Sequence, residues 1–419
     1  MYCGPILALV LCGLQAPASA QPLPLQQALD QAFAHSPDLQ VASARLSTAQ
    51  GRLIGAQTYP YNPTLQGQAA SRQDSQGRQG VDFQFSLSQQ LELAGQRGKR
   101  VNAAQASLAA EQAQLQRAQR LVAARVHLAF VSALEARDFA AVAQRDMALT
   151  ERLYDLAQRR LERGAGTQLD VNVAAAELGR AQASYQAANA TYTGQSAALA
   201  EAIGLDPTSL PQPRGALQRA LAPLPPLDQL VTSARDQRAD LQTLRAQIQA
   251  SLARHNLAQA AAWPNLTVRA FAGREDNTAT LLGGSLAIPL PLFNRNQGPI
   301  AETRAQIAAV RAELAAQTLT VEREVISAHA RYQASQRAAA RLRDLVFGTL
   351  EQNIELLQHS FEAGKATWPE VVVIRRTLVE AQRELTAAEA STRRAWVELQ
   401  LAAGHMPIPD TLSDEPEDN

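Results

Sequence analysis

The sequence predicts a mainly helical protein, built from two copies of one unit, that also contributes strands to a membrane β-barrel. Three observations lead to this prediction. A turn segment and its flanking helices recur about 200 residues apart, and each copy holds two alternating strands between long helices. The resulting four strands are too few to close a barrel, so several chains must share one.

The composition bounds the class of protein. Lys and Arg number 39, as do Asp and Glu, so no bulk charge attracts nucleic acid. The two cysteines, Cys3 and Cys12, fall at the N-terminus and leave the rest of the chain without disulfides or thiolate sites. The six histidines form no pair at i, i+3 or i, i+4, and we find no phosphate loop or catalytic triad spacing. We therefore expect no resident metal, no cofactor and no enzymatic activity.

Residues 1–20 are predicted to be a cleavable signal peptide. A short apolar stretch ends in the A-x-A site Ala18-Ser19-Ala20, although no basic residue precedes it. Lipidation of Cys12 is an alternative, which the bulky Leu11 before it disfavours. No later stretch reaches about 20 apolar residues, so we expect the exported chain to cross a membrane only as strands.

An internal duplication organises the mature chain. Repeat 1 is predicted over 21–206 and repeat 2 over 227–406, with a Pro-rich linker at 207–226 and an acidic tail at 407–419. Matching residues lie at an offset of 200: Gly164/Gly364, Thr167/Thr367, Asp170/Glu370, Val171/Val371, Val173/Val373 and Gly204/Gly404.

Each repeat is predicted to contain the same elements in the same order. A helix at about 25–57 or 227–262 precedes a β-hairpin at about 62–92 or 264–292. A long helix at about 98–160 or 299–360 and a shorter one at about 168–203 or 368–402 follow. Apolar positions in the long helices recur every seven residues, and about 60 residues span roughly 90 Å. The helices alone leave a soluble coiled-coil bundle open as an alternative.

The strands argue against that alternative. Val81, Phe83, Phe85 and Leu87 alternate with polar residues, so one face suits lipid and the other suits water. Open sheet edges are costly in lipid, which predicts a barrel of eight strands from two chains or twelve from three.

Prolines and aromatic residues mark the joints between strands and helices. Pro289 and Pro291 cannot donate ladder hydrogen bonds and are expected to end the strand, whereas Pro299 suits a first helical turn. Four aromatic residues near these joints are expected to form an interfacial girdle, with ordinary core packing as the alternative: Tyr59, Tyr61, Trp263 and Phe293.

These features together resemble the outer-membrane factor (TolC-like) family over essentially the whole mature chain. The resemblance rests on the motif Gly-x-x-Thr-x-x-Asp/Glu-Val at 164–171 and 364–371, and on the hairpins inserted between helices. The segments LELAGQRGKR (91–100) and PLPLFNRNQG (289–298) look like the heavy-metal cation efflux (CzcC-like) branch.

The resemblance implies a homotrimer, in which a 12-stranded outer-membrane β-barrel continues into a 12-helix periplasmic α-barrel. Its partners would be outer-membrane lipid, a periplasmic adaptor and an inner-membrane pump of the resistance–nodulation–division type, and its cargo heavy-metal cations. Drugs or a secreted protein are alternative cargoes. A periplasmic adaptor or a structural coiled-coil protein is the alternative from another class, which two hairpins of membrane length disfavour.

The resemblance also assigns roles to the two Gly-containing turns. They would be the periplasmic tips where adaptors dock, through Gly164, Thr167, Gly364 and Thr367. Glu370 matches a gate acid, Asp170 a latch acid, and Phe361 a latch aromatic that usually carries a hydroxyl. Val373 replaces a second gate acid, and Lys365 is expected to substitute for a missing latch arginine.

Overall fold

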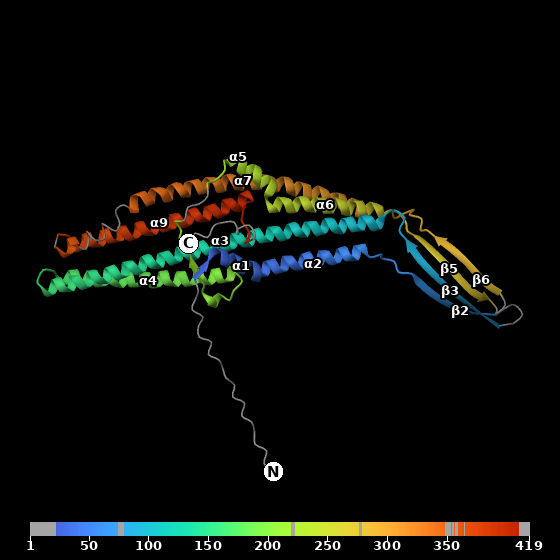
Figure 1. Cartoon of the computed structure of the whole chain (residues 1–419), viewed down its shortest axis with the longest axis horizontal. Helices are drawn as coiled ribbons and strands as arrows, with labels where there is room; N and C mark the ends of the chain where they lie inside the picture. Colours follow the sequence, from blue (N-terminus) through green and yellow to red (C-terminus); the bar gives the residue numbers. More distant parts are fainter. Residues whose placement is uncertain are drawn as a thin grey trace, which may run out of the picture.

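The computed structural model describes residues 22–73, 79–218, 223–275, 279–347, 353, 356, 359–363 and 365–409. The predicted signal peptide, Gly364 and most of the predicted acidic tail lie outside these residues. The chain forms a long rod of helices with a four-stranded sheet at one end (Figure 1).

The two repeats contribute equivalent elements along this rod. The first provides β1 (Pro22–Pro24), α1 (Leu25–His35), α2 (Pro37–Gln57), β2 (Thr64–Gln73), β3 (Gln79–Leu91), α3 (Gln96–Glu162) and α4 (Gln168–Ala202). The second provides β4 (Gln212–Arg214), α5 (Leu227–Gln237), α6 (Ala239–Ala260), β5 (Leu266–Glu275), β6 (Ala279–Ala287), α7 (Gln297–Phe347) and α9 (Trp368–Ala403). A 3-10 turn at Pro207–Ser209 precedes β4.

The first helix of each repeat is broken in two, where the sequence predicts one helix. Ser36, between α1 and α2, has a ψ of 123° because the proline ring of Pro37 disfavours helical geometry in the residue before it. Arg238, between α5 and α6, has nearly the same conformation with a ψ of 125° and no proline after it. Its guanidinium is held by Asp240 and Glu324, so polar contacts maintain the second break.

Helix α3 sets the length of the rod. Its 67 residues span about 100 Å. Helices α2 and α6 pack against the part nearer the sheet, and α4 and α9 pack against the remainder (Figure 1). Gly95 and Asn296, which precede α3 and α7, have left-handed backbones that these two residue types tolerate. Pro299 lies in the first turn of α7, as the sequence predicts.

The hydrophobic core is concentrated at two levels. In the middle of the rod, β1 pairs in parallel with β4, and α1 and α5 pack over the long helices around Leu29, Val126 and Leu230. The predicted Pro-rich linker therefore contributes a strand to the middle of the protein. A second cluster lies at the end remote from the sheet, around Leu153, Phe361 and Val371.

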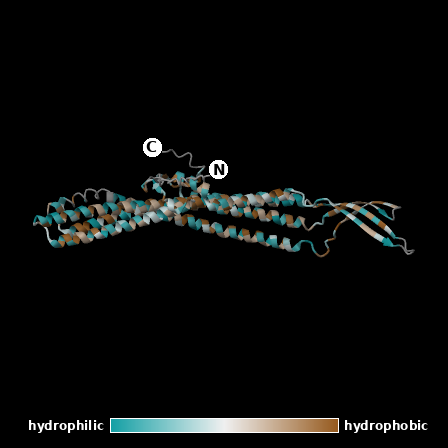
Figure 2. Ribbon diagram, turned by 90° about the horizontal axis from the view of Figure 1, so that it is seen from below, coloured by the Kyte–Doolittle hydropathy of each residue, from teal (hydrophilic) through white to brown (hydrophobic). Residues whose placement is uncertain are grey.

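Between the middle and the sheet, the helices bury little within one chain. Ile54 of α2 is 66% exposed there, and Leu319 and Ile326 of α7 are exposed beside the middle cluster. Hydrophobic and hydrophilic residues intermingle along the helices (Figure 2). Across the described part of the chain, no helix is long and apolar enough to cross a membrane.

Candidate functional site: the sheet, its joints and the helical tips

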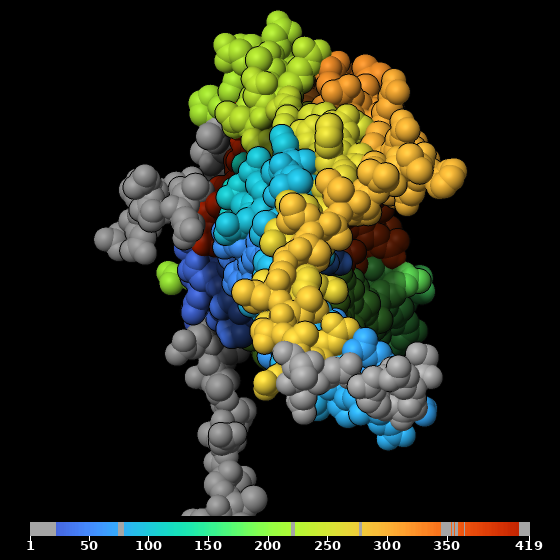
Figure 3. Space-filling view, turned by 90° about the vertical axis from the view of Figure 1, so that its right-hand side faces the viewer, coloured from blue at the N-terminus to red at the C-terminus, as the bar shows by residue number. Residues whose placement is uncertain are grey.

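The four long strands form one antiparallel sheet in the order β2-β3-β5-β6. Seen from this end (Figure 3), the strands cover only part of the rod and leave parts of α3, α5 and α7 visible beside them. Strands β2 and β6 lie at the edges, and neither has a second strand partner among the described residues. Unpaired backbone groups along both edges can accept further strands.

The two faces of the sheet differ in character. Val81, Phe83, Phe85 and Leu87 are all about half exposed or more, with Phe85 at 62%. The alternating residues of β3 are less exposed, and Ser86 is 8% exposed. The register places Gly67 opposite Phe85 on one side and Ala272 on the other, so the apolar face extends across three strands. This is the face that the sequence assigns to lipid.

Strand β6 ends earlier than the sequence predicts. It stops at Ala287, while the hairpin is predicted to reach about residue 292. The segment with Pro289 and Pro291 continues without strand pairing, because neither proline can donate to a ladder.

The four predicted girdle residues divide into two pairs. Tyr59 and Tyr61 pack edge to face, with ring centroids 5.9 Å apart. The Tyr59 hydroxyl donates to the Gln90 carbonyl (2.8 Å), and the Tyr61 hydroxyl accepts from Asn265 Nδ2 (2.9 Å). These contacts tie the segment before β2 to the end of β3 and the start of β5. By contrast, Trp263 and Phe293 are exposed at 68% and 90%.

At the other end of the rod, each turn leads into a helix with a capping box. Gly164 has the left-handed φ of 73° that ends α3. The Thr167 N–H donates to Asp170 Oδ2 (3.0 Å), and the Asp170 N–H donates to Thr167 Oγ1 (3.2 Å). This reciprocal pair satisfies two backbone donors at the start of α4.

The second turn repeats the arrangement at the start of α9. The Thr367 N–H and hydroxyl both donate to Glu370 Oε2, at 2.8 and 2.9 Å. The backbone hydrogen bond from Thr367 lowers the pKa of the Glu370 carboxyl, which is fully exposed. Val373, three residues further along the helix, is 63% exposed. The predicted gate residues thus lie on an open surface of one chain.

The predicted latch aromatic, Phe361, is buried between the two helix pairs. Its ring lies 5.2 Å from that of Trp368, and the Arg160 guanidinium stacks over it at 4.8 Å. Arg160 also donates to the Phe361 carbonyl, which joins α3 to the second turn. Because the ring fills an apolar site under a cation, it needs no hydroxyl there. Lys365 is exposed nearby.

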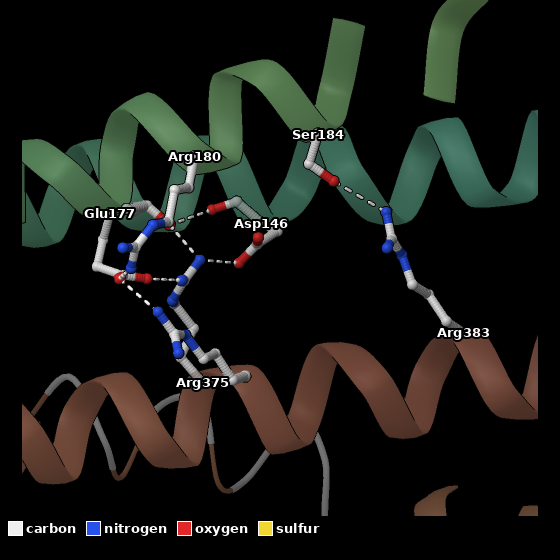
Figure 4. Close-up of polar contacts among 8 residues, drawn as sticks. Asp146, Glu177, Arg180, Ser184, Arg375 and Arg383 are labelled. Carbon is white, nitrogen blue, oxygen red and sulfur yellow. Dashed lines mark hydrogen bonds and ion pairs between the residues drawn. The ribbon is translucent and has the colours of Figure 1, made fainter. Parts of the chain in front are cut away.

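A buried ionic cluster lies about two turns further from the tips (Figure 4). Arg375 of α9 donates to Asp146 Oδ1 (2.6 Å) and Thr150 Oγ1 (2.8 Å) of α3, and to Glu177 Oε2 (2.7 Å) of α4. The Arg375 and Glu177 side chains are only 6% and 3% exposed. Arg376 and Arg180 also donate to Glu177.

These contacts set the charge state of the cluster. Burial alone would raise the pKa of the Glu177 carboxyl, but hydrogen bonds and charges from Arg376, Arg375 and Arg180 lower it below its ordinary value. Glu177 therefore stays ionised and joins the first helix pair to the second.

The comparison with known families decides what this architecture is. Residues 28–205 and 230–405 match the family described as outer membrane efflux protein, one match for each repeat. The chain belongs to this family. It is an outer-membrane efflux channel protein rather than an adaptor or a structural coiled coil.

Individual relatives of this efflux protein cover nearly all of its length. It is 27% identical over 369 residues to the cobalt-zinc-cadmium resistance protein CzcC of Cupriavidus metallidurans, covering 87% of this chain and 86% of that one. A membrane protein from Pseudomonas aeruginosa has the same fold, with a TM-score of 0.75, 19% identity and coverage of 91% and 90%. The structure of CusC matches with a TM-score of 0.74 and 16% identity, covering 91% of this chain and 92% of that one.

The ionic cluster of the efflux protein is the part of the site that the sequence analysis missed. Asp146, Glu177 and Arg375 lie on three helices, and no local spacing connects them. The available signal was the charged pair Arg375-Arg376 after the apolar run VVVI, on a helix already predicted to pack. A charge inside such a face requires a partner.

Proposed function

We propose that three copies of this chain form a passive export duct for heavy-metal cations, with a 12-stranded barrel in the outer membrane and a 12-helix tunnel in the periplasm. The observation that carries the proposal is the four-stranded sheet with unpaired edges at β2 and β6. Joining β6 of one chain to β2 of the next pairs both edges, and three chains supply twelve strands.

The helices support the same assembly. At the end remote from the sheet, each chain provides four helices, which are α3, α4, α7 and α9. Three chains therefore provide twelve helices. Apolar side chains that one chain leaves exposed, such as Leu319 and Ile326, would then contact a neighbouring chain. The apolar face of the sheet, which includes Phe85, would contact outer-membrane lipid.

The proposed cargo follows from the likeness to CzcC, whose name states resistance to cobalt, zinc and cadmium. The 369 aligned residues exceed the length of either repeat, so the alignment includes parts of both. The described residues hold no group of three His, Cys, Asp or Glu side chains that could bind a metal ion. A duct of this kind needs weak contacts with its cargo, because tight binding would slow release.

The tips are the proposed site of docking and closure. Thr167, Thr367 and the neighbouring turns, including Gly164 and Gly364, would meet a periplasmic adaptor that connects the duct to an inner-membrane resistance–nodulation–division pump. Three copies of Glu370 around the axis would form an acidic ring, with Val373 as an apolar ring beside it. Asp170, Phe361 and Lys365 would hold the helix pairs of the closed state.

Two measurements test this proposal. The detergent-solubilised full chain should have the mass of a trimer by light scattering and should dissociate on heating; a folded monomer would contradict the barrel argument. Expressed with its own adaptor and pump in a strain that lacks an outer-membrane metal channel, it should restore growth in zinc, cobalt or cadmium. Restored resistance to drugs alone would reassign the cargo while leaving the channel intact.

A further inference from the structure

The polar face of the sheet carries an arginine that no acidic residue offsets. Arg269 of β5 lies directly opposite Ser88 of β3 and Ser285 of β6, and Ser88 lies opposite Thr64 of β2. Pleating puts directly paired residues on one face, so these four residues form a row. Ser88 alternates with Leu87, which places the row on the face opposite Phe85.

Neighbouring rows on this face are also free of carboxylates. One side holds Gln66, Ser86, Phe271 and Gly283, and the other holds Gln90, Thr267 and Ala287. Arg269 is exposed and makes no hydrogen bond or ion pair with any residue that the structure describes. Its charge therefore faces the space on the polar side of the sheet.

Within the strands, the acidic residues of this face lie at its far end, and the Glu92 side chain, just past the near end of β3, is buried and paired with Arg100. Glu275 and Asp82 both approach Arg72, at 3.1 and 3.8 Å. Glu275 lies six positions along β5 from Arg269, which corresponds to about 20 Å along the strand. That separation exceeds the screening length of about 8 Å at physiological salt. The distant acids therefore do not neutralise Arg269.

Assembly does not add an acid at this level. The strand that meets β6 in the proposed trimer is β2 of the next chain, and its residues on the polar face near Arg269 are Thr64, Gln66, Gln68 and Ala70. Three copies of Arg269 would then encircle the lumen of the barrel without a compensating carboxylate.

We propose that these three copies of Arg269 form a positively charged belt, which makes the membrane section of the duct favour anions. This inference rests on the proposed trimeric channel. Metal ions would cross the belt with counter-anions or as complexes of low charge, because the wall repels bare divalent cations. The belt would thus oppose the acidic ring proposed at the tips.

The test uses the full chain reconstituted as a channel in a planar bilayer with a tenfold KCl gradient. The dilute side is held at about 30 mM, where wall charges are weakly screened. R269Q should lower the anion-to-cation permeability ratio by about two- to three-fold, and R269E should lower it further. R269K should behave as the wild type. At about 1 M salt, these differences should disappear.

Arg274 offers a matched control on the same strand. It lies opposite Phe83, on the apolar face, so R274Q removes the same charge without facing the lumen. Trimetaphosphate is added on the sheet side, so that the anion reaches the belt before the tips. It should block the wild-type channel and R274Q more strongly than R269Q. A conducting R269Q channel with unchanged permeability ratio and block would overturn the belt alone. A wild-type protein that forms no trimeric channel would overturn the proposed function and the belt together.

Discussion

Arg375 provides the sharpest test of how the two helix pairs are held together. In R375M, Asp146 and Thr150 lose a donor. Glu177, whose side chain is 3% exposed, loses its buried partner from α9 and keeps only the more exposed Arg376 and Arg180. Removing one member of a buried ion pair costs about 3–5 kcal/mol, since the remaining charge stays desolvated. We therefore expect a loss of this size in the free energy of unfolding of the helical region.

The neighbouring R376M substitution is a matched control. Arg376 also donates to Glu177 (2.6 Å), but its side chain is 53% exposed, so its loss should cost below about 1 kcal/mol. Urea unfolding of the detergent-solubilised protein, followed by far-UV circular dichroism, gives both values. Hydrogen exchange should show faster exchange near the start of α9 only in R375M. Equal losses for the two variants would refute the buried-cluster reasoning.

Three further predictions concern the other regions. F85R should lower the stability of the proposed barrel by about 2–4 kcal/mol in the same unfolding assay, whereas Q84R, on the polar face, should change it little. Equal losses would mean that the apolar face is wrongly assigned to lipid. Burial and then the charge of Arg393 lower the pKa of His127 from 6.5 to about 4, so its stabilisation is present above pH 6.5 and is lost as the pH falls toward 4. The stabilisation lost between these pH values amounts to about 3 kcal/mol. H127Q should therefore flatten the dependence of the unfolding free energy on pH in this window. An equally steep dependence in H127Q would mean that other groups cause it. E370Q should change cation selectivity and divalent block in single-channel recordings while leaving the trimer intact; unchanged recordings would leave Glu370 with the capping role alone.

Patterns within a short stretch of chain predicted much of the architecture. Alternation in β3 and β6, the heptads of the long helices and the Thr-x-x-Asp/Glu spacing before α4 and α9 are all local signals. Each depends on residues that contact one another within one strand or a few helical turns. The elements they predict appear at those places in the structure.

Features that depend on distant residues could not be predicted in the same way. The break at Arg238 depends partly on Glu324 of another helix, and the pairing of β1 with β4 involves three-residue strands rich in proline. Neither leaves a periodic trace in the sequence. Similarly, Tyr59 and Tyr61 are held at the joint by hydrogen bonds to the Gln90 carbonyl and from Asn265. Trp263 and Phe293 are exposed instead.

The duplication explains why the buried arginine and the buried carboxylate of the ionic cluster come from different repeats. At the offset of 200 that relates the tips, Arg375 and Arg376 correspond to Ala175 and Ala176, and Glu177 corresponds to Thr377. The two donors from α9, Arg375 and Arg376, therefore occur in the second repeat, and the main acceptor, Glu177, occurs in the first. Two first-repeat helix pairs placed side by side would leave Glu177 with Arg180 of its own helix and without the buried donor Arg375. Two second-repeat pairs would bury Arg375 without an acid, at the cost of an unpaired charge. The cluster thus favours the pairing of unlike repeats, which is the arrangement that the proposed ring of alternating first and second repeats requires.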